Sequence, residues 1–188
     1  MNTRLRITNE LIEIGRLLHR SGVFRARAGN LSARLPDGGF IITRAATHKG
    51  LLEPADFLRL DAAGEPVESG RPSSEVRLHM AAYATDEIGA VAHAHPLACT
   101  TLAHLGQPLA VELAEEGSPV LGDPPLLAAA SKELQAARWS EAVASGTRAA
   151  LLAEHGLVVA GRDARDILCK VELCEWLAEL QLRLRAAR

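Results

Sequence analysis

A short alternating segment, Val91 to Pro96, constrains the fold of this 188-residue chain most strongly. It has the pattern of a β-strand, in which side chains two residues apart leave the same face of the sheet. His93 and His95 are therefore expected to point into the same space, and Pro96 stops the strand directly after them. Two imidazoles so placed suit a divalent metal such as zinc, but two half-buried histidines bonded to backbone would give the same pattern.

A second apolar segment ends in another histidine. The run from Ala149 to Ala153 predicts a strand that leads to His155, and Gly156 permits a sharp bend or a close approach of backbone. Three imidazoles from two strand ends would leave one coordination position open, which is typical of a catalytic metal site. The sequence therefore predicts a metal centre made of His93, His95 and His155.

The composition favours one domain that spans residues 1–188, because 48% of the residues are hydrophobic and can fill a substantial core. The net charge of -2, without a basic patch, argues against nucleic acid as the main partner. The apolar runs are too short to cross a membrane, and the N-terminus lacks the pattern of a signal peptide. The three cysteines predict free thiols, packed in the core, in a protein of the reducing cytoplasm: Cys99, Cys169 and Cys174.

The remaining patterns predict helices that bracket a block of short strands. We expect helices over residues 3–21, from Ser73-Ser74-Glu75 to about Tyr83, over 97–105 and 126–145, and from Asp163 towards Arg188. We expect further strands over 31–35, 40–43, 57–60 and 157–160, the first two as a hairpin, and irregular chain over 107–124. The order predicts an α/β fold with helices on both faces of a mainly antiparallel or mixed sheet.

Five motifs resemble, in this order, those of the class II aldolase/adducin family, and most of all its fuculose-phosphate aldolase branch. They are Gly29-Asn30-Leu31-Ser32, Ile42-Thr43, Ser73-Ser74-Glu75, His93-Ala94-His95 and His155-Gly156. The resemblance extends over about residues 10–180. It implies a three-layer α/β/α fold and a homotetramer with active sites between neighbouring subunits. It also implies a zinc ion held by the three histidines, with Glu75 as the acid/base.

The primary hypothesis is a zinc-dependent aldolase that cleaves a small sugar phosphate. Zinc would grip the substrate's carbonyl and stabilise the enediolate left when the carbon–carbon bond breaks, and Glu75 would exchange a proton with that enediolate. The alternatives keep the metal and Glu75 but change the reaction to that of a dehydratase of the methylthioribulose-phosphate type, a decarboxylase or an epimerase. A non-catalytic interaction domain like the head of adducin would have no need for three histidines and a carboxylate.

Four polar residues are expected to bind the substrate, because their hydroxyls, amide and backbone N–H groups suit a phosphate: Asn30, Thr43, Ser73 and Ser74. Ser73 or Ser74 is also expected to cap the helix that follows. Relatives in the family usually have a glycine soon after the position of Thr43, where this chain has Arg44-Ala45-Ala46. The phosphate is therefore expected to meet Arg44 or Lys49, or the substrate lacks a phosphate there.

The chain departs from the aldolases in its proton-handling groups. The aldolases use tyrosines from a neighbouring subunit or the C-terminal tail, whereas this chain has one tyrosine, Tyr83, inside a predicted helix. The acidic segment 112–116 stands where the aldolase would offer such a group. The exact reaction is therefore left open among the alternatives above. The other histidines are expected on the surface or in hydrogen bonds: His19, His48, His79 and His104.

Overall fold

The structure is a computed structural model that describes residues 3–128 and 131–187. Its strands form one seven-stranded sheet in the order β3-β2-β1-β4-β7-β6-β5. All neighbouring strands pair antiparallel except β5 and β6, which are parallel. The strands are β1 (Asn30–Arg34), β2 (Phe40–Thr43), β3 (Phe57–Leu60), β4 (Ala90–Ala94), β5 (Leu126–Leu127), β6 (Ala149–Leu152) and β7 (Gly156–Gly161).

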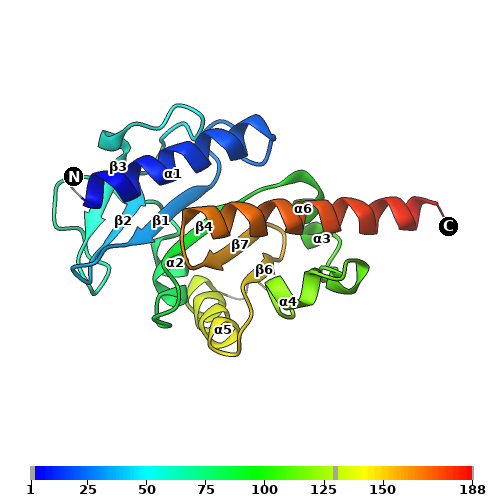
Figure 1. Ribbon diagram of the computed structural model, residues 1–188. Coiled ribbons are helices and arrows are strands. Elements are labelled where there is room, and N and C mark those ends of the chain that lie inside the picture. Colours follow the sequence, from blue (N-terminus) through cyan, green and yellow to red (C-terminus); the bar gives the residue numbers. More distant parts are fainter. Residues whose placement is uncertain (1–2, 129–130, 188) are drawn as a thin grey trace.

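Helices cover both faces of this sheet (Figure 1). One face carries α1 (Thr3–Arg20), α3 (Leu97–His104) and α6 (Ala164–Ala186), with the short α4 (Gly117–Leu121) beside α6. The other face carries α2 (Val76–Ala82) and α5 (Lys132–Ala144), which pack against each other. Two 3-10 turns, Pro54–Asp56 and Val111–Leu113, complete the described helical segments.

The side chains of the strands contribute to two separate hydrophobic cores, one on each face of the sheet. In β2, Ile41 belongs to the cluster under α1 and α6, whereas Phe40 and Ile42 belong to the cluster under α2 and α5. This alternation follows from the two-residue period of a strand. The fold is therefore a three-layer α/β/α sandwich with a mixed, mainly antiparallel sheet, which confirms the predicted fold class.

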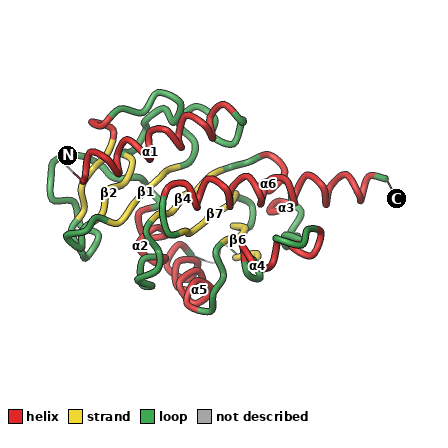
Figure 2. The backbone as a smooth tube through the Cα atoms, viewed as in Figure 1, coloured by secondary structure: helices red, strands yellow, loops and turns green. Residues whose placement is uncertain are grey.

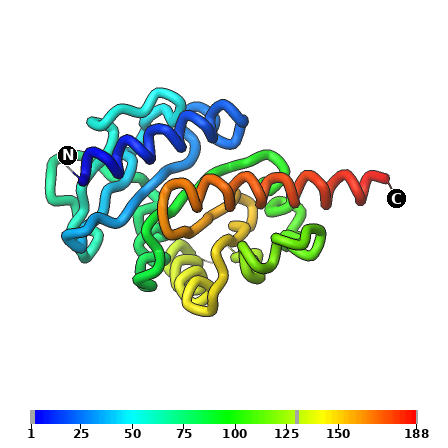
Figure 3. The backbone as a smooth tube through the Cα atoms, viewed as in Figure 1, coloured from blue at the N-terminus to red at the C-terminus, as the bar shows by residue number. Residues whose placement is uncertain are grey.

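Most predicted elements are present, as the tube in Figure 2 shows. The β1–β2 hairpin forms with Arg34 opposite Phe40, and α6 begins after Asp163, whose side chain accepts a hydrogen bond from the Asp166 N–H. In α1, Leu11 and Leu18 are fully buried, whereas Leu17 is 37% exposed. The colour sequence in Figure 3 shows how far α6 extends beyond the sheet at its C-terminal end.

The predicted long helix over 126–145 is wrong in its first part. Leu126 and Leu127 form β5, which pairs with β6, and α5 begins only after Ser131, whose hydroxyl accepts from the Leu134 N–H. Pairing with a distant strand overrides the helix propensity of this alanine-rich segment. Residues 129 and 130 of the predicted helix lie outside the described residues. The segment 107–124 is less irregular than predicted, because it contains α4 and a 3-10 turn.

Two further findings concern the cysteines and the membrane. Cys99 and Cys174 are buried as predicted, but Cys169 is exposed, because it lies on the outer side of α6. No described helix is long and apolar enough to cross a membrane.

Candidate functional site

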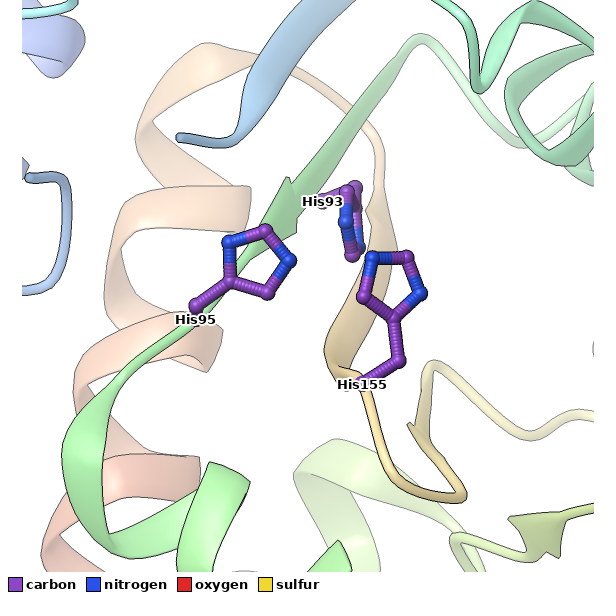
Figure 4. A group of neighbouring side chains, drawn as sticks. All are labelled: His93, His95 and His155. Atoms are coloured by element: carbon purple, nitrogen blue, oxygen red, sulfur yellow. The ribbon is translucent and has the colours of Figure 1, made fainter. Parts of the chain in front are cut away.

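Three histidines converge at one end of the central strands (Figure 4). His93 lies near the end of β4, His95 follows that strand, and His155 ends the turn between β6 and β7. Because β7 pairs antiparallel with β4, with Leu157 opposite Ala94, the turn lies beside the end of β4. The ring centroids are 4.6 Å apart for His93–His95 and His93–His155, and 4.9 Å for His95–His155. The structure thus brings together the three predicted ligands, each of which offers a nitrogen within 4.8 Å of the others.

The local backbone explains this convergence. Glu154, in the β6–β7 turn, adopts a positive φ of 57°, and Gly156 follows where no side chain fits. A Cβ on Gly156 would lie 2.5 Å from the carbonyl oxygen of Ala94 and 2.7 Å from Cδ2 of His95. The glycine therefore allows the close backbone approach that the sequence predicted, and it leaves room for the His95 ring.

The protonation state of the triad also suits a metal. The Nδ1 of His93 lies 2.9 Å from the carbonyl oxygen of Leu157, so Nδ1 carries the hydrogen and Nε2 is left as a ligand atom. Burial lowers the pKa values of His93, His95 and His155, and mutual repulsion lowers those of His93 and His95 further. Neutral imidazoles keep the lone pairs that a divalent ion needs, so these residues fit such an ion.

Glu75 lies beside the triad and has a cationic partner that the sequence did not indicate. It occupies the N-cap position of α2, and its side chain is 11% exposed. The Nζ of Lys132, in the first turn of α5, donates to Glu75 Oε1 at 2.7 Å. The field of Glu75 raises the pKa values of His95 and His155, which opposes their desolvation. Glu75 is thus an ionisable group placed next to a metal site.

A cavity of about 370 Å³ contains both the triad and Glu75. Its other lining residues come mainly from the loops before β1 and after β2 and from the start of α2: Arg27, Ala28, Gly29, Asn30, Arg44, Ala45, Ala46, Lys49, Arg71, Ser73 and Ser74. Apart from Glu75, the charged side chains of this lining are cationic. The cavity therefore suits an anionic ligand bound near a metal.

Arg44 and Lys49, the two cationic residues that were expected to contact a phosphate, line the cavity, but both donate hydrogen bonds to backbone carbonyl groups. Arg44 donates to the carbonyl oxygens of Ala55 at 2.9 Å and Ser69 at 2.8 Å. Lys49 is 2% exposed and donates from Nζ to the carbonyl oxygen of Thr47 at 2.7 Å. Burial lowers the pKa of Lys49 to about 8, so the ammonium form still predominates at pH 7. Lys49 thereby joins the two loops that form this side of the cavity, because it also reaches the Arg27 carbonyl.

The four predicted substrate-binding residues are not all brought to the cavity. Asn30, Ser73 and Ser74 line it, whereas Thr43 is fully buried and its hydroxyl accepts a hydrogen bond from the Leu31 N–H at 3.2 Å. The expected serine cap of α2 is wrong. The helix begins at Val76 with Glu75 at the N-cap and no side-chain cap bond, because Ser73 and Ser74 lie in the turn before it.

The remaining histidines behave as predicted. His19 bonds to the carbonyl oxygen of Phe24 at 3.0 Å, His48 accepts from the Gly50 N–H, and His104 is exposed. His79 is fully buried in hydrogen bonds to Asn30 and Ser32.

A larger cavity of about 670 Å³ lies at the opposite ends of β4 and β7, between Glu87 and Arg162. Its charged groups are paired with one another: Arg148 with Glu87 at 3.0 Å, and Asp166 with both Lys170 and Arg162. The described residues around it include no cluster of metal ligands. The smaller cavity is therefore the candidate functional site, because it contains the possible metal ligands and the larger one does not.

Comparisons with known proteins agree with this geometry. Residues 9–182 match the family model described as the class II aldolase and adducin N-terminal domain. The methylthioribulose-1-phosphate dehydratase of Methylococcus capsulatus is 33% identical over 201 residues, which cover 95% of this chain and 94% of the relative. The protein of the same name from Gluconobacter oxydans is 34% identical over 186 residues, with 92% and 89% covered.

Solved structures lead to the same family. The L-fuculose-1-phosphate aldolase of Thermus thermophilus superimposes with a TM-score of 0.85 at 28% identity, and the match covers 97% of this chain and 95% of that one. The family model matches almost the whole chain, and the matched residues include all three histidines of the candidate metal site. The chain belongs to the class II aldolase and adducin family.

Proposed function

We propose that this protein is a metal-dependent lyase that removes water from a ketose phosphate, with methylthioribulose-1-phosphate as the substrate. The observation that carries the proposal is the similarity to methylthioribulose-1-phosphate dehydratases along nearly the full length of the chain. The aldolase reaction, which was the primary hypothesis from the sequence, has support only at the level of the family. In this chain either reaction would use the same three histidines and the same carboxylate, that of Glu75.

The donor set suits zinc, because neutral imidazole nitrogens are among its preferred ligands and three of them leave an open position. The ion would be held by His93, His95 and His155. When bound, it supplies a Lewis acid that polarises the substrate's carbonyl group.

The residues of the chain supply the binding and the proton transfer. Dehydration removes the proton from the carbon beside the carbonyl and the hydroxyl from the next carbon, and together these make one water. Glu75 takes up the proton and returns it to the departing hydroxyl. Lys132 keeps the Glu75 carboxylate in place, and Asn30, Ser73 and Ser74 hold the phosphate with the help of the cationic lining. Thr43 supports this lining through its hydrogen bond to Leu31.

Product analysis separates the dehydratase from the aldolase. Metal-loaded protein is incubated with methylthioribulose-1-phosphate, and the products are identified by NMR spectroscopy and mass spectrometry. The proposal expects a single phosphorylated product that is lighter than the substrate by one water. Two carbonyl fragments would instead identify an aldolase, and an unchanged substrate would contradict both reactions. The Glu75→Gln protein is the control for metal-catalysed decomposition.

The proposed assembly is a homotetramer with active sites near subunit interfaces, as the family resemblance implies. The acidic segment 112–116 is absent from the lining of the cavity of its own chain. In the proposed tetramer this segment would instead contribute to the active site of a neighbouring subunit. Light scattering on active protein tests this assembly, and a stable monomer with full turnover would contradict it.

A further inference from the structure

A buried chain of side-chain hydrogen bonds leads from the cavity into the core under α2. Asn30 Oδ1 lies 2.5 Å from His79 Nε2, and His79 Nδ1 lies 2.6 Å from Ser32 Oγ. Ser32 Oγ lies 2.7 Å from the hydroxyl of Tyr83. All four residues are buried, with exposed fractions of 6% for Asn30, 1% for Ser32, 0% for His79 and 5% for Tyr83. Only Asn30 lines the cavity, so the other three act on a ligand through it.

The direction of these hydrogen bonds follows from their inner end. If Ser32 donated to Tyr83, the hydrogen of the Tyr83 hydroxyl would need another acceptor, but among the described residues Ser32 Oγ is the one side-chain partner of this hydroxyl. A buried hydroxyl without an acceptor is costly. Tyr83 therefore donates to Ser32, Ser32 donates to His79 Nδ1, and His79 Nε2–H donates to Asn30 Oδ1.

The charge state of His79 agrees with the same direction. Burial lowers the pKa of His79 to about 3, so the ring is neutral at pH 7 and has one N–H to donate. A neutral ring that accepts at Nδ1 must donate at Nε2. The chain of bonds thus selects one of the two tautomers.

We infer that His79 and Ser32 are positioning residues that lock the Asn30 side chain with its amide nitrogen towards the cavity, where it donates to an anionic oxygen of the substrate. An asparagine amide can otherwise turn over and present its oxygen, which would repel a phosphate. This inference rests on the proposed phosphate-bearing substrate. It goes beyond that proposal because it attributes the orientation of the Asn30 amide group to His79 and Ser32, which do not line the cavity.

The first test is the tautomer itself, which needs no turnover. In ¹⁵N-labelled full-length protein, the imidazole resonances of His79 are expected to show a protonated Nε2 and an unprotonated Nδ1 at pH 7. The exposed His104 serves as the reference, and His104→Gln assigns its signals. A His79 ring with its hydrogen on Nδ1, or with both nitrogens protonated, would overturn the inference.

The second test adds inorganic phosphate to the metal-free protein. The side-chain amide resonances of Asn30 are expected to shift, and Asn30→Asp is expected to weaken phosphate binding by roughly 10- to 100-fold, the range for a hydrogen bond to a charged group. The aspartate keeps the shape and the bond from His79 but presents an oxygen to the cavity. Equal phosphate affinity in the wild-type and Asn30→Asp proteins, or no binding by either, would overturn the role of Asn30 as a donor.

Two hydroxyl deletions separate positioning from packing. In Ser32→Ala, nothing donates to His79 Nδ1, so both tautomers are expected, and an even mixture would weaken phosphate binding by about 2-fold. In Tyr83→Phe, Ser32 still donates to Nδ1, so the wild-type tautomer is expected to persist. A single unchanged tautomer in Ser32→Ala would contradict the relay. Failure of the proposed function is distinguishable, because it would leave the tautomer and the Asn30 shift intact while methylthioribulose-1-phosphate stays unconverted.

Discussion

Glu75 and His95 lie in the same cavity but are expected to contribute in different ways. Glu75→Gln keeps the shape of the side chain and removes its basicity, so turnover should fall by at least about 100-fold, the lower range for a general acid–base group. Bound metal should stay near the wild-type level, because the histidines remain. His95→Ala should lose both the metal and turnover. Metal analysis and rate measurement on both proteins check this, and full activity in Glu75→Gln would reduce Glu75 to a helix-start acid.

The Lys132–Glu75 ion pair gives a second prediction for single residues. Lys132 is 62% exposed while Glu75 is 11% exposed, so solvent weakens the pair. Lys132→Met should therefore lower turnover by about 5-fold, the upper end for an exposed pair, and Lys132→Arg should recover most of it. Steady-state kinetics measures both.

A matched control for this pair lies on the same two helices. Arg77 and Glu133 form an ion pair in which the side chains are 68% and 67% exposed, away from the cavity lining. Arg77→Met should leave turnover unchanged. If it lowers turnover as much as Lys132→Met does, the effect comes from the packing of α2 on α5 and not from contact with Glu75.

The β6–β7 turn supplies a prediction about an element. Gly156→Ala would place a methyl group against the Ala94 carbonyl and the His95 ring, so the turn must shift and His155 moves relative to His95. We expect a loss of about 1–3 kcal/mol in the free energy of unfolding, the usual cost of overpacking, together with weaker zinc binding. Urea unfolding and zinc titration measure these two effects.

Gly106→Ala separates these two effects. Gly106 has open space around its Cα but a φ of 66°, so an alanine there is strained without touching the metal site. It should lower stability and leave zinc affinity unchanged. Equal loss of zinc affinity in both variants would mean that general destabilisation, and not the position of His95, weakens the site.

The same elements explain what the sequence could and could not predict. The i, i+2 spacing of His93 and His95 is a local signal, and the strand that ends near His155 is a local signal as well. The two meet because β7 pairs antiparallel with β4, a long-range contact that the resemblance to the family implied and no local pattern encodes. The Lys132–Glu75 pair joins residues 57 apart, at the starts of two helices that are distant in the sequence and pack against each other in the fold. No local pattern encodes that contact. The start of α5 was missed although Ser131 is a good cap, because the alanines before it favour a helix and only pairing with β6 makes β5 a strand.

At the scale of the whole molecule, burial of neutral histidines makes stability depend on pH. His79 has a pKa of about 3 in the folded protein, against about 6.5 in the unfolded chain. Between these two pH values the unfolded chain binds a proton that the folded protein does not. The contribution of His79 to the free energy of unfolding is therefore complete above about pH 6.5 and decreases as the pH falls below that value. From pH 7 to pH 5, His79 alone should cost about 2 kcal/mol of unfolding free energy. The lowered pKa of His93 acts in the same direction.

Urea unfolding of the metal-free protein at pH 7 and pH 5 tests this linkage. Glu68 and Asp166, whose pKa values lie below their ordinary ones, also lose stability as the pH falls, and this loss comes mainly below pH 5. His104→Gln removes an exposed histidine and should keep the full difference between the two pH values. His79→Gln should be less stable at both pH values but show a smaller difference, because the buried titrating group is gone. If His79→Gln keeps the full difference, the acid sensitivity comes from other groups, such as the triad, and burial of His79 contributes nothing to it.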